Sequence, residues 1–163
     1  MLHEMGLLIF LAVISTSTAQ QNLETQIGSN YCDGSLWKRV YKPQRLQKLQ
    51  PSCITVTGTI GKSQTEKDGN FYVQFKLDPK PVFKKLLNDR NRKAQNGNLI
   101  LRPVCMHKVT RPDAVAACKN FTPKLRVPDQ GMHVMVTGTY VQDNARNHGW
   151  REIHPVTSIL PIP

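Results

Sequence analysis

Hydrophobic and polar positions alternate along two stretches near the C-terminal end of the chain. Between positions 131 and 140, Val134 and Val136 alternate with His and Thr, the period of two that is typical of a strand with one buried face. A polar turn at 142–147, which contains Asp and Asn, separates this run from a second one at 148–159. The pattern therefore predicts a C-terminal β-hairpin.

A second hairpin is predicted earlier in the chain. Residues 52–61 alternate apolar positions with Thr and contain Gly58, which is typical of a bulge or a close backbone approach. After a polar loop at 61–70, residues 71–77 alternate again. The tetrapeptide Val-Thr-Gly-Thr of the first strand recurs at 136–139, so two strands of matching design are expected at opposite ends of the domain.

Helical patterns interrupt the strands at two places. Residues 79–98 contain Pro81, then apolar positions at spacings of three and four with a basic face, which predicts a short amphipathic helix. Residues 99–105 form a third apolar run, in which Pro103 indicates an edge or a bulge. Residues 112–118 begin with Pro and predict a helix of one or two turns.

The order of these elements predicts a fold class. Five strands, with one helix inserted between strands 2 and 3 and another between strands 3 and 4, favour an all-β domain with short helices. The specific expectation is a five-stranded Greek-key barrel of the OB-fold type. We assign residues 31–163 to this single domain.

The first 30 residues have a different character. An apolar run at 6–14 followed by small residues up to Ala19 predicts a secretory signal peptide at 1–19. The run is too short to span a bilayer, so we expect a secreted protein with no transmembrane span after its removal. The absence of Lys and Arg from 1–5 leaves an uncleaved anchor or a different start open. Residues 20–30 are polar and predict a flexible lead.

The cysteines agree with export. Cys32, Cys53, Cys105 and Cys118 are even in number and none has the C-x-x-C spacing, which in an oxidising compartment favours two disulfides over a metal site. Three pairings are possible. We favour Cys32 with Cys53 and Cys105 with Cys118, because each bond joins neighbouring segments and stabilises by about 3 kcal/mol. A sequon at Asn120 is a candidate glycosylation site.

The charge of the chain narrows the class of partner. Lys and Arg number 22 against 11 Asp and Glu, a net charge of +11. Outside the cell such a charge favours polyanions: nucleic acid, anionic polysaccharide or a cell surface. Composition alone does not choose among them, and we expect no cofactor.

The predicted fold indicates where a polyanion would bind. OB-folds use strands 2 and 3 and the loops that join strands 1 to 2 and 4 to 5. Basic groups neutralise phosphates while rings stack on bases or sugars. The residues that combine these properties at the expected face are Lys62, Lys67, Tyr72, Lys76, Arg146, His148 and Trp150.

Two other functions remain open. His148, Glu152 and His154 share one face of the last predicted strand and are weak candidates for a metal site or for a metal-assisted phosphodiester hydrolase. Six residues of strand span about 20 Å, so His148 and His154 cannot share one ion unless the strand bends. A polar network in which Trp150 packs is favoured. A third class is a structural subunit that binds other extracellular proteins.

Three motifs carry a resemblance to a known group. These are His-Gly-Trp-Arg-Glu-Ile-His-Pro at 148–155, Val-Thr-Gly-Thr at 136–139 and Pro-Asp-Ala-Val-Ala-Ala-Cys at 112–118. Over 31–159 the chain resembles exported bacterial and archaeal proteins of unknown function. The resemblance implies export and an OB-like fold but no activity. The turn at 143–147 is more basic than that group leads us to expect.

Overall fold

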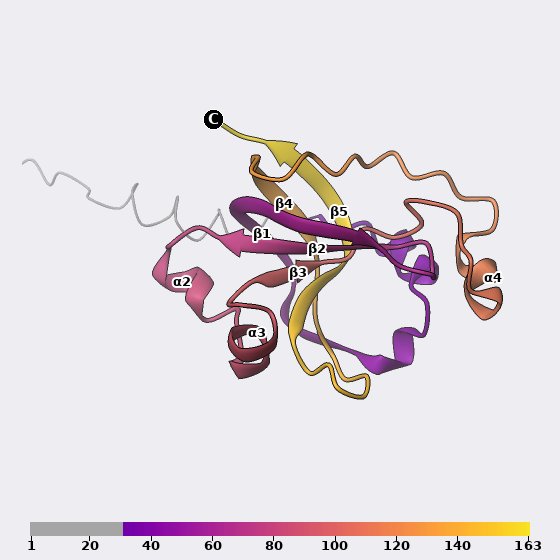
Figure 1. The fold of residues 1–163 in the computed structure, drawn as a ribbon, viewed down its shortest axis with the longest axis horizontal. Helices are drawn as coiled ribbons and strands as arrows, with labels where there is room; N and C mark the ends of the chain where they lie inside the picture. Colours follow the sequence, from indigo (N-terminus) through magenta and orange to yellow (C-terminus); the bar gives the residue numbers. More distant parts are fainter. Residues whose placement is uncertain (1–30) are drawn as a thin grey trace, which may run out of the picture.

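The computed structural model describes residues 31–163 (Figure 1). The predicted signal peptide at 1–19 and the lead at 20–30 lie outside the described residues. The strands are β1 (Leu46–Thr65), β2 (Phe71–Leu77), β3 (Leu99–Leu101), β4 (His133–Asp143) and β5 (Arg151–Pro161). The helices are short: η1 (Gly34–Arg39), η2 (Pro43–Arg45), α2 (Pro81–Lys84), α3 (Asp89–Ala94), η3 (Pro112–Ala114) and α4 (Val115–Cys118).

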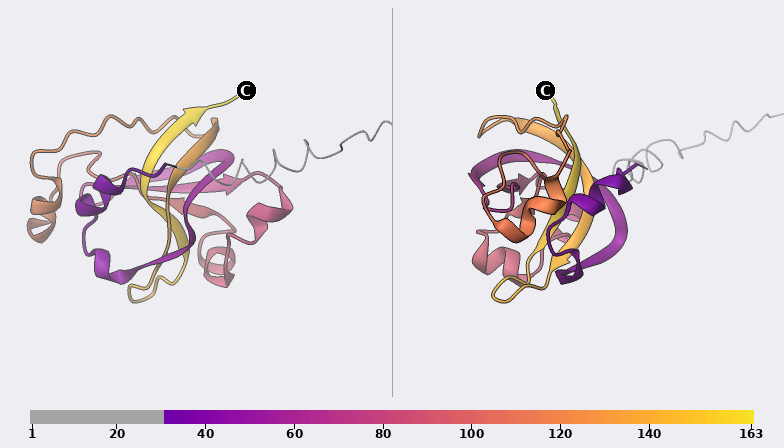
Figure 2. Two further views of the ribbon diagram at one scale, coloured as in Figure 1. Left: turned by 180° about the vertical axis from the view of Figure 1, so that it is seen from behind. Right: turned by 90° about the vertical axis from the view of Figure 1, so that its right-hand side faces the viewer.

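The five described strands form a mixed sheet that closes in a ring. Their order is β1-β2-β3-β5-β4, and β4 pairs again with β1. Neighbouring strands are antiparallel except β3 and β5, which are parallel. Both predicted hairpins, β1 with β2 and β4 with β5, are present. Helices α2 and α3 lie toward one end of the ring, and α4 and residues 31–45 lie toward the other (Figures 1 and 2).

Strand β1 is longer than the predicted run at 52–61. It has 20 residues because its first part, from Leu46, pairs with the end of β4, and its last part, to Thr65, pairs with the start of β2. The sequence pattern did not predict these two ends because their side chains are mostly polar and solvent-exposed, so hydrophobic and polar positions do not alternate there. Strand β3 is shorter than predicted and ends two residues before Pro103.

The single helix predicted at 79–98 is two helices. Pro81 begins α2, and Asn88 then starts α3 as its N-cap. The side chain of Asn88 accepts from the Asn91 backbone N–H at 3.0 Å, and the side chain of Asn91 accepts from the Asn88 N–H at 3.3 Å. This reciprocal capping separates the two helices. The helix predicted at 112–118 is present as η3 and α4.

The repeated Val-Thr-Gly-Thr segments lie on paired strands and meet at their first residues. Val56 of β1 lies opposite Val136 of β4. A Cβ atom on Gly58 would lie 2.2 Å from the Lys76 carbonyl oxygen, and one on Gly138 would lie 2.5 Å from that of Pro155. Only glycine permits the chain to approach its neighbours this closely at both positions.

All five strands contribute to the main hydrophobic core. Its fully buried members include Ile54, Phe75, Leu99, Val134 and Ile153. A second, smaller cluster forms where residues 31–45 and α4 cover the sheet, and it consists of Val40, Leu46, Val104, Cys105 and Val141.

The structure confirms the favoured disulfide pairing. Cys32 bonds to Cys53 and ties the segment before η1 to β1, and Cys105 bonds to Cys118 and closes the loop after β3. Two disulfides are consistent with an oxidising environment. None of the helices in residues 31–163 has the length and hydrophobicity that a membrane span needs. Asn120 of the sequon lies exposed just after α4.

Candidate functional site

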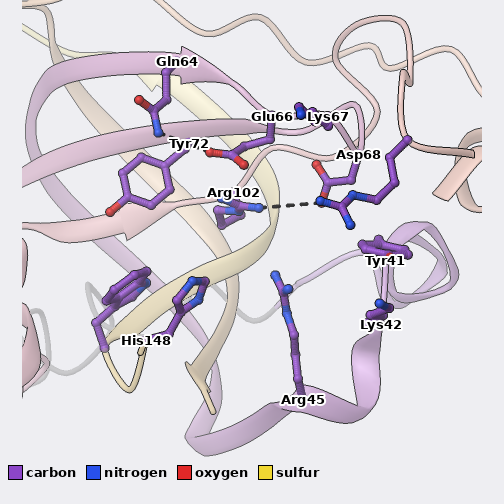
Figure 3. A pocket seen from close by; sticks show the side chains of 12 residues that line it. Tyr41, Lys42, Arg45, Gln64, Glu66, Lys67, Asp68, Tyr72, Arg102 and His148 are labelled. Atoms are coloured by element: carbon purple, nitrogen blue, oxygen red, sulfur yellow. Dashed lines mark hydrogen bonds and ion pairs between the residues drawn. The ribbon is translucent and has the colours of Figure 1, made fainter. Parts of the chain in front are cut away.

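A cavity of about 440 Å³ opens between the turn that joins β1 to β2 and the segment that precedes β1 (Figure 3). Its basic side chains are Lys42, Arg45, Lys67, Arg102 and Arg111. Its rings are Tyr41, Tyr72, His148 and Trp150, and its remaining side chains are Gln64, Glu66 and Asp68. We call this cavity the Arg102 pocket.

Arg102 lies at the centre of the pocket, between Tyr72 and Asp68 (Figure 3). It directly follows β3, and its backbone N–H donates to the Ile153 carbonyl of β5 at 2.9 Å. Its side chain is only 7% exposed, and its nearest carboxylate is Asp68, 3.7 Å away and beyond hydrogen-bond distance. Its buried Nε has no hydrogen-bond partner within residues 31–163. A buried cation in this state requires an explanation.

Asp68 itself is hydrogen-bonded within its own turn. Its carboxylate accepts from the backbone N–H and from the side-chain Nδ2 of Asn70, both at 3.1 Å. The Asn70 side chain in turn accepts from the Cys105 N–H at 3.1 Å. Asp68 therefore compensates Arg102 only partly, because each of its oxygens is held by Asn70 and the nearer one stays 3.7 Å from the guanidinium.

Asp143, at the end of β4, contacts two residues that line the pocket, His148 and Arg45. Its buried carboxylate accepts from His148 Nδ1 at 2.8 Å and lies 3.4 Å from Arg45 Nη2. The His148 ring stacks on Trp150 with 4.2 Å between ring centroids. This stacking requires a tight turn, which Asn147 and Gly149 provide with positive φ angles of 68° and 83°.

Behind Trp150 lies a buried pair, Glu152 and His154. Glu152 accepts from Trp150 Nε1 at 3.2 Å and from His154 Nδ1 at 2.9 Å. We place the His154 proton on Nδ1 because that nitrogen faces a carboxylate. His154 Nε2 has no partner in the described residues. With the proton on Nδ1, the unpartnered Nε2 is an acceptor, which costs less to bury than an unpartnered N–H donor.

The charge states of this pair follow from burial and from the nearby cations. Burial alone would raise the pKa of Glu152, but the hydrogen bond from His154 and the charges of Arg102 and Arg45 lower it below its ordinary value. Burial lowers the pKa of His154, and its bond to Glu152 opposes this only in part. Glu152 is therefore anionic and His154 neutral at pH 7.

Tyr72 forms the aromatic wall next to Arg102. Its ring meets Trp150 edge-on at 6.3 Å, its hydroxyl donates to Gln95, and Arg102 Cζ lies 5.5 Å from its centroid. Burial and the charge of Glu152 raise the pKa of Tyr72 to about 12, so the hydroxyl stays protonated. Tyr72 is therefore a neutral aromatic side chain that faces the cationic Arg102.

The predicted binding residues separate into four places. Lys67, Tyr72, His148 and Trp150 all line the Arg102 pocket. Lys62 lines a neighbouring hollow that also includes Tyr72 and Gln74. Lys76 lines a different cavity, beside Pro79 and Lys84, and Arg146 lies exposed in the turn between β4 and β5.

Sequence reasoning missed Arg45, Arg102, Arg111 and Tyr41. Three of these residues lie in segments that were interpreted as irregular cover or as loops. Arg102 did leave a signal, because it is a charged residue at the end of the apolar run Leu-Ile-Leu-Arg-Pro-Val. A charge in a strand that is expected to be buried indicates either a partner or a site.

The weak metal candidates do not share one site. Glu152 and His154 are in contact, whereas His148 Nδ1 bonds to Asp143 and Trp150 intervenes. Within residues 31–163 no group of three or more His, Cys, Asp or Glu side chains is arranged to hold a metal ion. The hydrolase alternative needs His154 in contact with a substrate, but that side chain is fully buried. The network with Trp150 that the sequence favoured is present.

A comparison of the chain with protein-family models, with curated proteins and with solved structures finds no match. The resemblance carried by the motif at 148–155 is therefore untested.

Proposed function

We propose that this protein is a secreted, basic binding module of the OB-fold type that holds a polyanion at the Arg102 pocket. The polyanion is single-stranded nucleic acid or an anionic glycan. The observation that carries the proposal is the buried Arg102 guanidinium, which lines the pocket with its Nε unpartnered among the described residues and with its carboxylate, Asp68, 3.7 Å away. An anionic oxygen in the pocket would supply the missing acceptor.

The charges around Arg102 support the same ligand class. Five basic side chains line the pocket against two acidic ones, Glu66 and Asp68. In residues 31–163 neither Lys67 nor Arg111 has a carboxylate within 4.0 Å. Two unit charges 4 Å apart attract by about 4 kcal/mol at the effective dielectric of a protein surface. The pocket therefore favours a negatively charged occupant.

The order of the strands supports the fold type. A ring ordered β1-β2-β3-β5-β4, with a helix between β3 and β4, is the arrangement expected of an OB-fold. The pocket lies beside β2 and β3, where such folds bind oligonucleotides and oligosaccharides. The rings of Tyr72 and Trp150 add stacking surface, worth about 1–3 kcal/mol per base.

The test compares Arg102→Met with Arg102→Lys. Affinity for a labelled single-stranded oligonucleotide and for a sulfated polysaccharide is measured by fluorescence anisotropy at two salt concentrations. We expect the unmodified protein to bind at least one polymer more weakly at higher salt. Arg102→Met should lose about ten-fold or more in affinity, and Arg102→Lys should lose less, because the charge remains.

Thermal melting of both variants checks that they are folded. If the unmodified protein binds neither polymer at low salt, the proposal fails and the structural-subunit alternative takes its place. If Arg102→Met binds as well as the unmodified protein, the site is elsewhere.

A further inference from the structure

We propose that the Arg102 pocket recognises the phosphorylated end of a single-stranded nucleic acid, a terminal phosphomonoester with its nucleoside, and not the interior of the strand. This inference rests on the function proposed above and deepens it. It follows from the shape of the site, the arrangement of its cations and the side chains at its rim.

The cations converge on one pocket and are not spaced along a groove. Arg45 comes from the segment before β1, Arg102 from the end of β3, and Lys67 and Arg111 from two loops. The two loops are joined, because the Lys67 carbonyl accepts from the Thr110 and Arg111 N–H groups at 3.0 and 2.9 Å. The backbone therefore holds two unpaired cations side by side.

A strand interior would require a different distribution. It presents one phosphate per nucleotide, so binding along it needs basic side chains spaced along a groove. Lys62, Lys76 and Arg146 were expected to extend such a groove, but none of them lines the Arg102 pocket. The volume of about 440 Å³ lies in the range of small-ligand sites and matches one nucleotide better than a length of polymer.

The number of donors matches a monoester. A terminal phosphate carries a charge of about −1.5 to −2 near neutral pH and three strong acceptor oxygens, whereas a diester carries a single charge. The site offers three guanidinium groups, of which Arg45 and Arg102 are each only partly compensated by one carboxylate, at 3.4 and 3.7 Å. Charge-assisted pairs of this kind are about twice as strong as neutral hydrogen bonds.

The rim of the pocket favours a nucleoside over a sugar sulfate. Tyr72 and the stacked pair His148 and Trp150 offer flat faces and edges for a base. Gln64 donates to Glu66 at 3.2 Å, and this exposed amide and carboxylate provide donor and acceptor groups for base or sugar edges. We therefore commit to nucleic acid, and a glycan is an outcome of the test.

The experiment uses one oligonucleotide sequence in three forms: with a 5′-phosphate, with a 3′-phosphate and with neither. Affinities are measured by isothermal titration calorimetry at a single salt concentration. We expect one phosphorylated form to bind about ten-fold or more tightly than the unphosphorylated one. The matching nucleoside monophosphate should compete for the site, while the nucleoside alone should not.

The outcomes separate this inference from the function on which it rests. Equal affinity for all three forms would overturn end recognition and leave the proposed polyanion binding intact. No binding to any form, together with tight binding to a sulfated polysaccharide, would overturn the nucleic-acid assignment alone. No binding to any probe would overturn both.

A pair of exposed variants keeps the test independent of folding. Lys67→Gln with Arg111→Gln should reduce the preference for the phosphorylated form, because both cations line the pocket and both residues are exposed, and the one ring contact of Arg111, with Tyr41 at 5.6 Å, makes thermal melting the check on folding. The matched control, Lys84→Gln with Lys85→Gln, removes the same charge at the α2 end of the ring. If the control reduces the preference equally, the effect is general charge and the inference fails.

Discussion

His154 donates its Nδ1 proton to Oε1 of Glu152 across 2.9 Å, and neither side chain is in contact with solvent. The other oxygen of the same carboxylate accepts from Trp150 Nε1. A single buried carboxylate therefore fixes both the histidine beneath the pocket and the tryptophan at its wall.

Removing this carboxylate should destabilise the fold. In Glu152→Ala the donors of Trp150 and His154 lose their acceptor, and each buried unsatisfied donor costs about 1–3 kcal/mol. We expect a loss of this order in the free energy of unfolding, measured by chemical denaturation. His154→Ala should also destabilise. Glu152→Gln should lose less, because one amide oxygen can still accept from one donor. A change of less than about 0.5 kcal/mol in Glu152→Ala would contradict the buried network.

The stability of the protein should fall as the solution becomes acidic. His154 has a lowered pKa in the folded protein, so below its ordinary value of 6.5 the unfolded chain binds a proton that the folded protein does not. The lowered pKa of Glu152 acts in the same direction at lower pH. Melting temperature should therefore fall between pH 7.5 and pH 4.5.

A matched pair of variants assigns this pH dependence. His154→Phe should flatten the curve just below pH 6.5, whereas His133→Ala should not. The pKa of His133 is raised by its hydrogen bond to Asp78, so any stability that it adds is present below 6.5 and is lost as pH rises through the raised pKa. A melting temperature independent of pH would refute the assignment.

Gly138 should not tolerate a side chain. In Gly138→Ala the new Cβ would lie 2.4 Å from Ile153 Cγ2 and 2.5 Å from the Pro155 carbonyl oxygen. The pairing of β4 with β5 would have to shift, and overpacking of this kind costs about 1–3 kcal/mol. Gly34→Ala is the control, because nothing lies within 4 Å of its added Cβ. Equal melting temperatures for the two variants would contradict the close approach.

The disulfide between Cys105 and Cys118 should support the pocket as well as the fold. It closes a loop of 13 residues, and Cys105 and Met106 donate backbone N–H groups to Asn70 and Gly69 beside Asp68. Replacing both cysteines with serine should cost about 3 kcal/mol of stability. Affinity for the polyanion should also decrease, because the loop that carries Arg111 is then held less firmly against the turn that carries Lys67. Unchanged affinity in a folded double variant would show that the loop contacts suffice.

Local patterns predicted the strands but not the pocket. The alternation of apolar and polar residues at 52–61, 71–77 and 131–140 indicates which side of each strand is buried. This pattern is local, because it can be read from a few consecutive residues. Arg45, Arg102 and Arg111 meet only because the ring closes and brings distant segments together. The spacing of these residues in the sequence does not predict that they lie close together.

The predicted binding face shows the same limit. Lys62 and Lys76 were placed on one surface because the expected fold binds along its second strand and the loop before that strand, yet they line different cavities. Lys67 was found because it lies in the loop between the two strands, and Tyr72 because it lies on the outward face of the second strand. The helix at 79–98 was interpreted as one element because its apolar spacing is continuous, while the caps at Asn88 and Asn91 divide it.

Strand β1 has a consequence for the rate at which a ligand is captured. Arg45 immediately precedes the strand and Gln64 lies near its end, and the two lie on opposite sides of the pocket (Figure 3). Because β1 is paired with β4 at one end and with β2 at the other, both walls are in place before a ligand arrives. Little loop ordering then opposes association. With a net charge of +11 to attract anions, encounter should be fast and sensitive to ionic strength, and the lifetime of the complex should depend on dissociation.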